Sequence, residues 1–151
     1  CGLLLILGYG AGSVERVLRR ELGLAPLITA VDDDPVMFQL AREHFGLAVH
    51  PHTHVVVEDA FAFLQRDSGP YDLVLVDLFN DLDVVPAVAS DSTLAALRRL
   101  TRPGGKAMVN VVVHSAATAE ASARIGAGSR HYFGEVRENR YEGNNRVFIA
   151  L

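Results

Sequence analysis

The sequence contains no tryptophan, a single cysteine and no long hydrophobic run. One cysteine, Cys1, cannot form an internal disulfide, and its place at the first position favours an incidental role over a catalytic one. The apolar stretch Leu3 to Leu7 is far shorter than the ~20 residues of a membrane span and lacks the basic leader of a signal peptide. These absences predict a cytoplasmic protein without a membrane partner.

The sequence also lacks the excess of basic residues that is typical of nucleic-acid-binding proteins. The chain has 14 Lys and Arg against 18 Asp and Glu, for a net charge of −4, so we expect no nucleic-acid partner. Its 151 residues contain no repeat, linker or low-complexity tract, which predicts one domain over residues 1–151. Because the first residue is not Met and an apolar run follows almost at once, we expect a preceding natural segment to be missing.

Short runs of Val, Ile and Leu alternate with segments of helical period. The runs predict strands at 3–7, 27–31, 54–57, 72–77 and 106–113, and helices begin near Ser13, Asp34, Asp59 and Ser90. Pro103-Gly104-Gly105 is expected to stop the fourth helix, and 116–125 to form a fifth. Strands at 131–138 and 146–151 would close the sheet as an antiparallel hairpin. The pattern predicts an α/β, doubly wound, Rossmann-like fold with a mostly parallel, seven-stranded sheet.

Three glycines follow the first strand in the segment Gly8-Tyr9-Gly10-Ala11-Gly12-Ser13. Glycines allow a ligand to approach the main chain, and free N–H groups at a helix start favour polar or anionic ligand atoms. The dinucleotide fingerprint has its third glycine at the position of Ser13, so the spacing here favours a ligand without a pyrophosphate. A tight turn without a ligand is the alternative.

Acidic residues follow the second and third predicted strands. Asp32 is placed to accept hydrogen bonds from both ribose hydroxyls of a nucleoside, and Asp33 to touch the edge of the adenosine. Asp34, before Pro35, is better explained as a helix N-cap. Asp59 is placed to bind the exocyclic amine of adenine or to cap the next helix, and one carboxylate can do both.

Together these motifs resemble the class I S-adenosylmethionine-dependent methyltransferase fold and, within it, the spermidine synthase family. The matching segments are the glycine loop, Val31 to Pro35, Glu58-Asp59-Ala60, Tyr71 to Asp77, Leu100 to Lys106 and Gly143 to Ile149. The resemblance implies that S-adenosylmethionine or its decarboxylated form binds, with Gly8, Tyr9, Gly10 and Gly12 around its methionine part. It implies that Asp32 takes the ribose, that Asp59 and Ala60 meet the adenine, and that Asp77 lies at the reacting centre.

An amine acceptor would need a base at that centre, because an ammonium must lose a proton before it attacks. Asp77 ends the fourth predicted strand and is placed for this role; a cap without chemistry is the alternative. In the following loop, Phe79 and Asp81 could bind the stem and the charge of a flexible cation such as a polyamine. An ordinary surface loop is equally compatible with the composition.

Two departures from the spermidine synthase pattern concern the donor tail and the acceptor. Ala11 stands where the family has an aspartate, and Asn80 stands where the family has a second acid. The family's N-terminal hairpin region, which helps to close the amine site and to form dimers, is absent from this sequence; a homodimer remains compatible with the resemblance. Adenosyl binding is therefore predicted more firmly than aminopropyl transfer.

Two remaining features carry weaker signals. His50, His52 and His54 alternate along a loop that enters a strand, so their side chains point in different directions and we expect no metal site. Asn110 interrupts the apolar fifth strand and could reach the crevice or satisfy a neighbouring backbone group.

The leading hypothesis is a spermidine-synthase-like transferase, in polyamine biosynthesis, that moves an aminopropyl or methyl group to a small acceptor. A small-molecule methyltransferase and a non-catalytic adenosyl-binding module are the alternatives. A nicotinamide oxidoreductase is disfavoured by Ser13.

Overall fold

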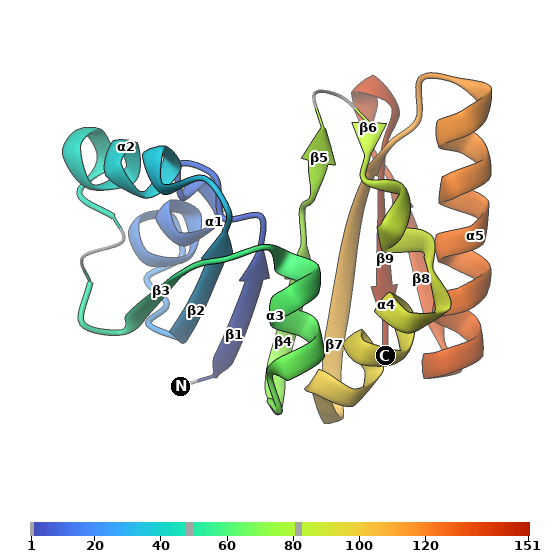
Figure 1. The fold of residues 1–151 in the computed structure, drawn as a ribbon, viewed down its shortest axis with the longest axis horizontal. Helices are drawn as coiled ribbons and strands as arrows, with labels where there is room; N and C mark the ends of the chain where they lie inside the picture. The colour runs from blue at the N-terminus through green and yellow to red at the C-terminus, as the bar shows by residue number, and fades with distance from the viewer. Residues whose placement is uncertain (1, 48–49, 81–82) are drawn as a thin grey trace.

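A seven-stranded sheet forms the centre of the computed structural model, which describes residues 2–47, 50–80 and 83–151 (Figure 1). Its strands are β1 (Leu3–Leu7), β2 (Leu27–Asp32), β3 (Thr53–Val57), β4 (Tyr71–Val76), β7 (Thr101–Val112), β8 (Val136–Arg140) and β9 (Asn145–Ala150), in the order β3-β2-β1-β4-β7-β9-β8. The first five of these are parallel, and β9 pairs antiparallel with both β7 and β8. The predicted fold class is confirmed.

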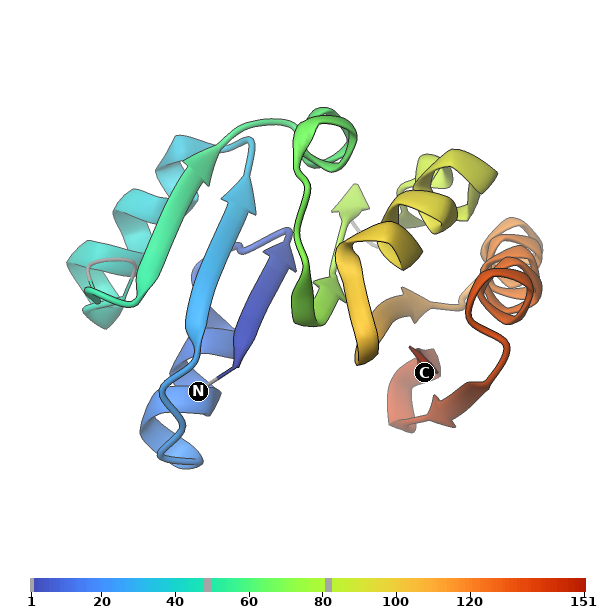
Figure 2. The ribbon, with the colours of Figure 1, turned by 90° about the horizontal axis from the view of Figure 1, so that it is seen from below.

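Helices cover both faces of the sheet (Figure 2). On one face lie α1 (Ser13–Arg16), which continues as a π-helical segment (Val17–Glu21), and α2 (Pro35–Phe45); on the other lie α3 (Ala60–Arg66), α4 (Asp91–Leu100) and α5 (Ala116–Phe133). Side chains of a strand alternate between faces, so Leu5 and Leu7 join the core under α3 to α5, while Leu4 and Ile6 join the core under α1 and α2. Single turns of 3-10 helix occur at Pro86–Ala89 and Glu142–Asn144.

Polar side chains begin the helices that follow the strands. Asp34 accepts a hydrogen bond from the N–H of Val36 at 2.8 Å, and Asp59 accepts one from the N–H of Ala62 at 2.8 Å. Ser90 caps α4 in the same way. These bonds satisfy N–H groups that the helices leave unpaired, and they confirm the three predicted N-caps. Each of α2 and α3 therefore starts directly beside the carboxyl end of the strand before it.

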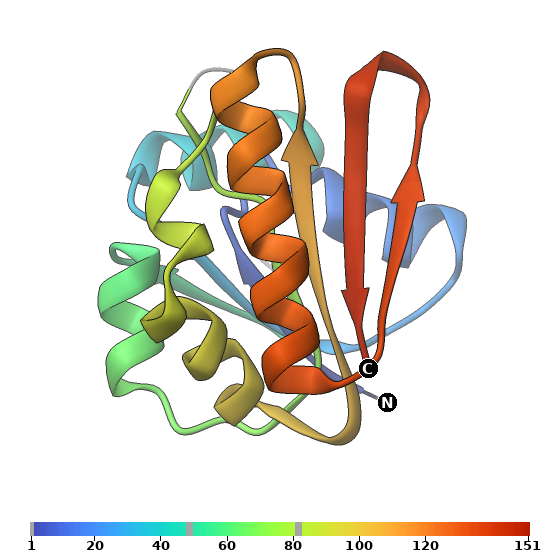
Figure 3. The same ribbon diagram turned by 90° about the vertical axis from the view of Figure 1, so that its right-hand side faces the viewer.

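Two boundaries differ from the sequence prediction in the last third of the chain. Helix α5 continues through Phe133 and β8 begins only at Val136, so the strand expected over 131–138 was wrong for its first five residues, of which three are helical. Tyr132 and Phe133 pack against the core from the helix, and Gly134 ends it with a φ of 87°. Figure 3 shows α5 in front of the sheet with the β9–β8 hairpin beside it.

The end of α4 also differs from the prediction. The helix ends at Leu100, and Pro103-Gly104-Gly105 lie inside β7 instead of stopping the helix. The hydroxyl of Thr101 donates to the carbonyl of Leu97 at 2.7 Å, while the Thr101 backbone already pairs with Tyr71 of β4. The register between β4 and β7 then shifts, which accommodates the proline and the two glycines.

A two-stranded hairpin of β5 (Phe79–Asn80) and β6 (Asp83–Val84) stands beyond the carboxyl end of β4, where the sequence predicts only a loop (Figure 1). Among the helices that the structure describes, none is both long and apolar enough to cross a membrane.

Candidate adenosyl-binding site

A cavity of about 450 Å³ opens at the carboxyl ends of β1, β2, β3 and β4. Nine of the residues predicted for the site lie in its wall: Gly8, Tyr9, Gly10, Asp32, Asp33, Asp59, Ala60, Asp77 and Phe79. They come from four successive strand ends, which parallel strands bring to one edge of the sheet. Gly12 does not line the cavity, and Asp81 lies outside the described residues.

The glycine loop makes a close turn between β1 and α1. Gly8, Gly10 and Gly12 all have positive φ, at 82°, 54° and 85°, a backbone conformation that residues other than glycine rarely adopt. At Gly8 a Cβ atom would collide with the main-chain carbonyl of Asp77. At Gly10 it would meet nothing within 4 Å, so the main chain there is open to a ligand. The loop is therefore tight against β4 at one end and accessible at the next glycine.

Asp32 ties this loop to the end of β2. One of its carboxylate oxygens accepts a hydrogen bond from the N–H of Gly10 at 2.8 Å, and the other accepts one from the N–H of Asp34 at 3.1 Å. A carboxylate has about four acceptor positions, so these bonds leave capacity for two hydroxyl groups. Its position in the cavity wall and its fixed orientation suit it to a ribose.

The neighbouring acids differ in whether they line the cavity, cap a helix or do both. Asp33 is exposed and lines the cavity, whereas Asp34 caps α2 and does not line it. Asp59 lines the cavity while one of its oxygens caps α3, so the capping and ligand-facing positions coincide in one residue. Ala60, next to it, is buried and contributes a small apolar surface to the wall.

Asp77 follows β4 and is half-buried between two cavities. Its N–H donates to the carbonyl of Leu7 at 2.9 Å, which continues the pairing of β1 with β4. The side-chain amide of Asn110, on β7, donates to a carboxylate oxygen of Asp77 at 2.9 Å. The sequence left the partner of Asn110 open, and the tertiary structure identifies it as Asp77.

A second cavity of about 180 Å³ adjoins Asp77 and Asn110. Its other walls are apolar: Val14, Leu75, Val76, Met108 and Val147. Both cavities therefore share one carboxylate, with polar groups of the strand ends on one side and an apolar sheet surface on the other.

Four residues in the wall of the larger cavity were absent from the sequence prediction of the site: Ser13, Phe61, Leu78 and Val85. Phe61 directly follows the predicted Asp59-Ala60 pair, so its place one residue further along could have indicated it. Leu78 and Val85 flank the β5–β6 hairpin, and no sequence pattern predicts that they line the cavity. Ser13 follows the last glycine of the loop, where the sequence predicts a helix start and no contact with a ligand.

The cavity is acidic. Among the described residues that line it, four are aspartates and none is Lys, Arg or His. A concave surface of one sign attracts ligands of the opposite charge and opposes a pyrophosphate. The lining therefore fits a sulfonium nucleoside better than a dinucleotide. Over the part of the chain that the structure describes, no three His, Cys, Asp or Glu side chains are grouped as metal ligands would be.

Comparison with known proteins agrees with this geometry. A family model described as "Methyltransferase domain" matches residues 4–105, which include the glycine loop and every described acid of the cavity. The fold and the site define a nucleoside-binding α/β transferase domain. The chain belongs to the methyltransferase domain family and has the class I fold of the S-adenosylmethionine-dependent transferases.

Individual relatives include enzymes of two transfer reactions. The chain is similar to polyamine aminopropyltransferase 2 of Pseudomonas aeruginosa, with 32% identity over 145 residues, which are 90% of this chain and 41% of the relative. The chain thus spans about two fifths of that relative's length. Human methyltransferase-like protein 13 in complex with SAH superposes with a TM-score of 0.85 at 22% identity, covering 99% of this chain and 71% of that one.

A probable spermidine synthase from Corynebacterium glutamicum superposes with a TM-score of 0.82 at 20% identity, covering 98% of this chain and 55% of that one. At such identities the two solved structures establish the shared fold alone.

Proposed function

We propose that the protein transfers an alkyl group from S-adenosylmethionine, or from its decarboxylated form, to a small amine such as a polyamine. The observation that carries the proposal is the cavity in which the glycine loop and four aspartates meet without a basic side chain among the described lining residues. This charge favours a cationic donor and a cationic acceptor. The proposal assigns residues 1–151 to one donor-binding domain and the protein to polyamine biosynthesis in the cytoplasm.

The donor would lie along the strand ends. Asp32 would accept hydrogen bonds from the ribose hydroxyls, and Asp33 would lie at the adenosine edge. Asp59 would accept one from the adenine amine, with Ala60 against the ring. The loop from Gly8 to Gly12 would surround the methionine part. This assignment is supported by the open main chain at Gly10 and by the fixed orientation of Asp32.

The donor supplies a carbon bound to a positively charged sulfur. Asp77 would accept the proton that an ammonium must lose before its nitrogen can attack. As the nitrogen–carbon bond forms, the carbon–sulfur bond breaks, and its electron pair goes to the sulfur. Asn110 would keep the Asp77 carboxylate directed at the acceptor through the 2.9 Å hydrogen bond. Alignment supplies most of the remaining rate, since well-oriented groups gain up to ~7–11 kcal/mol.

The acceptor would lie against Asp77. Phe79 lines the larger cavity and offers an apolar surface to methylene groups, and the smaller cavity offers Met108 and Val147. A flexible amine has this combination of a charged end and an apolar stem. Asp81 is proposed to bind a second charged end of the acceptor.

A transfer assay with both donors tests the proposal. The purified protein is incubated with S-adenosylmethionine or its decarboxylated form and with putrescine, spermidine or a monoamine, and the products are separated by mass. The expected product gains one aminopropyl or one methyl group on nitrogen. Binding of S-adenosylhomocysteine without transfer to any amine would contradict amine transfer and favour methyl transfer to another small molecule or a non-catalytic adenosyl-binding module.

Methyl transfer to another small molecule is the second candidate. It is favoured by Ala11, which offers no carboxylate for the ammonium of an aminopropyl donor, and by the exposed Asn80, which offers none for an amine acceptor. If this candidate is correct, S-adenosylmethionine binds more tightly than its decarboxylated form. Calorimetry with the two donors distinguishes methyl transfer from aminopropyl transfer, which requires the opposite order, and the transfer assay shows whether an amine is the acceptor.

A further inference from the structure

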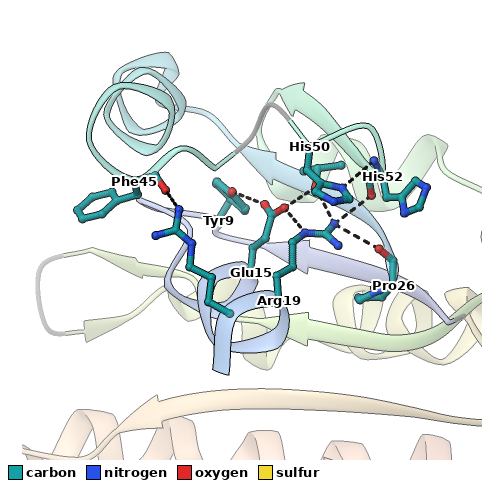
Figure 4. A network of polar contacts seen from close by, with 9 residues as sticks. Tyr9, Glu15, Arg19, Pro26, Phe45, His50 and His52 are labelled. Atoms are coloured by element: carbon teal, nitrogen blue, oxygen red, sulfur yellow. Dashed lines mark hydrogen bonds and ion pairs between the residues drawn. The ribbon is translucent and has the colours of Figure 1, made fainter. Parts of the chain in front are cut away.

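A buried carboxylate lies outside the cofactor cavity, beneath the glycine loop. Glu15 of α1 is fully buried and accepts three hydrogen bonds at 2.6 Å: from the Tyr9 hydroxyl, from Nε of Arg19 and from the Thr53 hydroxyl (Figure 4). It does not line the cavity, and the proposed reaction makes no use of it. A buried charge with this many donors calls for a structural or functional explanation.

The network joins segments that are distant in the sequence. Arg19 also donates to Oγ1 of Thr53 at 3.0 Å and to the carbonyl of Pro26 at 3.3 Å, so α1 is bound to the starts of β2 and β3. Burial by itself raises the pKa of Glu15, but the hydrogen bonds from Arg19, Thr53 and Tyr9 and the charge of Arg19 outweigh it, and the pKa lies below its usual value. The carboxylate is thus ionised at neutral pH.

Tyr9 links this network to the cavity. It stands between Gly8 and Gly10 in the cavity wall, and its N–H donates to the carbonyl of Val31 at 3.1 Å. Its side chain is buried on the other side of the loop, where the ring stacks on Phe38 with centroids 5.2 Å apart and the hydroxyl reaches Glu15.

The Tyr9 side chain also packs closely against Gly12, at the end of the loop. A Cβ atom at Gly12 would lie 2.7 Å from the hydroxyl oxygen of Tyr9, so the loop closes directly over the ring. One side chain therefore anchors a loop that contains three glycines with positive φ, each of which has wide conformational freedom when unfolded.

We propose that Glu15 is a positioning residue for the adenosyl ligand: through the Tyr9 hydroxyl it holds residues 8–12 in the conformation that receives the donor. A loop that is already ordered loses less conformational entropy when the ligand binds, so the affinity for the donor depends on a hydrogen bond outside the cavity. The inference rests on the proposed function for the identity of the ligand.

Two matched substitutions separate positioning from stability. Tyr9→Phe and Thr53→Val each remove one hydroxyl donor from the same carboxylate, at the same 2.6 Å distance, but only Tyr9 belongs to the loop. Calorimetry with S-adenosylhomocysteine is expected to show Kd raised about fivefold or more in Tyr9→Phe and unchanged within about twofold in Thr53→Val. Thermal unfolding is expected to show a lowered Tm for both.

Unchanged affinity in Tyr9→Phe would overturn the proposal, and so would an equal loss of affinity in both variants, since that outcome reflects stability alone. Glu15→Gln keeps the shape of the side chain and provides a second test of the proposal. In the Tyr9→Phe background it is expected to change Kd by less than about twofold, because Glu15 acts through the hydroxyl that is already absent. A full, additive loss in the double variant would contradict the pathway.

Hydrogen exchange distinguishes failure of this inference from failure of the proposed function. If the wild-type protein binds no adenosyl compound, the proposed function is wrong, yet the amides of residues 8–12 still report whether Glu15 holds the loop. Faster exchange of these amides in Tyr9→Phe than in Thr53→Val is the expected result. Equal exchange in the two variants would overturn the positioning role.

Discussion

Asp32 organises the site before any ligand is present, because the N–H groups of Gly10 and Asp34 orient both of its carboxylate oxygens. Asp32→Ala is expected to weaken adenosyl binding by ~1–3 kcal/mol, since the ribose hydroxyls lose their acceptor. Calorimetry with S-adenosylhomocysteine measures this loss.

The matched control is Asp34→Ala. This substitution removes the cap of α2 and costs about 1 kcal/mol of stability, but Asp34 does not line the cavity. Its affinity should equal that of the wild type. An unchanged affinity in Asp32→Ala would remove Asp32 from the site.

Asp77 differs from Asp32 because its partner is a side chain. Asp77→Asn keeps the shape of the residue but cannot accept a proton, so turnover with an amine is expected to fall about 10²–10⁴-fold while S-adenosylhomocysteine still binds. Steady-state kinetics beside calorimetry separate the two effects. Turnover close to that of the wild type would restrict Asp77 to a structural role at the end of β4.

At the scale of elements, the glycine loop offers a contrast within one turn. Gly8→Ala should destabilise the fold by well over ~2 kcal/mol, because its Cβ would meet the Asp77 carbonyl in addition to the cost of a positive φ. Gly10→Ala should cost only the ~1–2 kcal/mol of its positive φ, since no atom lies near its Cβ. Chemical denaturation measures both.

Gly10→Ala, the more stable of the two variants, should still lose affinity for the ligand. In Gly10→Ala the new methyl group occupies space at the cavity wall, so affinity for S-adenosylhomocysteine should fall more than stability does. Equal stability losses at the two glycines would contradict the packing argument.

Helix α5 shows why element boundaries were harder to predict than element types. The sequence around His131 to Phe133 is aromatic and resembles a strand, but Tyr132 and Phe133 gain contact with the core when the helix continues. The segment after β4 was harder still, because β5 and β6 are strands of only two residues, too short to show an alternating pattern. Tertiary packing overrides local propensity in such segments.

At the scale of the molecule, the buried Glu15 couples stability to pH. Its pKa in the folded protein is lowered from 4.5, so its ionised form adds stability at pH values above 4.5, and this contribution is lost as the pH falls through the folded pKa. Because Glu15→Gln leaves the Arg19 guanidinium without its anionic partner, the variant should be destabilised by about 3 kcal/mol or more at pH 7. The difference from the wild type should shrink as the pH falls below 4.5 and Glu15 of the wild type becomes protonated. Urea unfolding between pH 3 and 7 checks this; a constant difference would contradict it.

From the sequence alone follow the alternation of strands and helices, the three helix N-caps and nine of the described residues that line the cavity. These follow from local rules: strands alternate with helices, caps sit at helix starts, and acids after parallel strands meet at one edge of the sheet.

The contacts between residues that are distant in the sequence are known from the tertiary structure. It pairs Asn110 with Asp77, places Leu78 and Val85 in the cavity wall, and joins Glu15 to Tyr9, Arg19 and Thr53 beneath the loop. Such contacts depend on register and packing between distant segments, and periodicity along one segment contains no information about them.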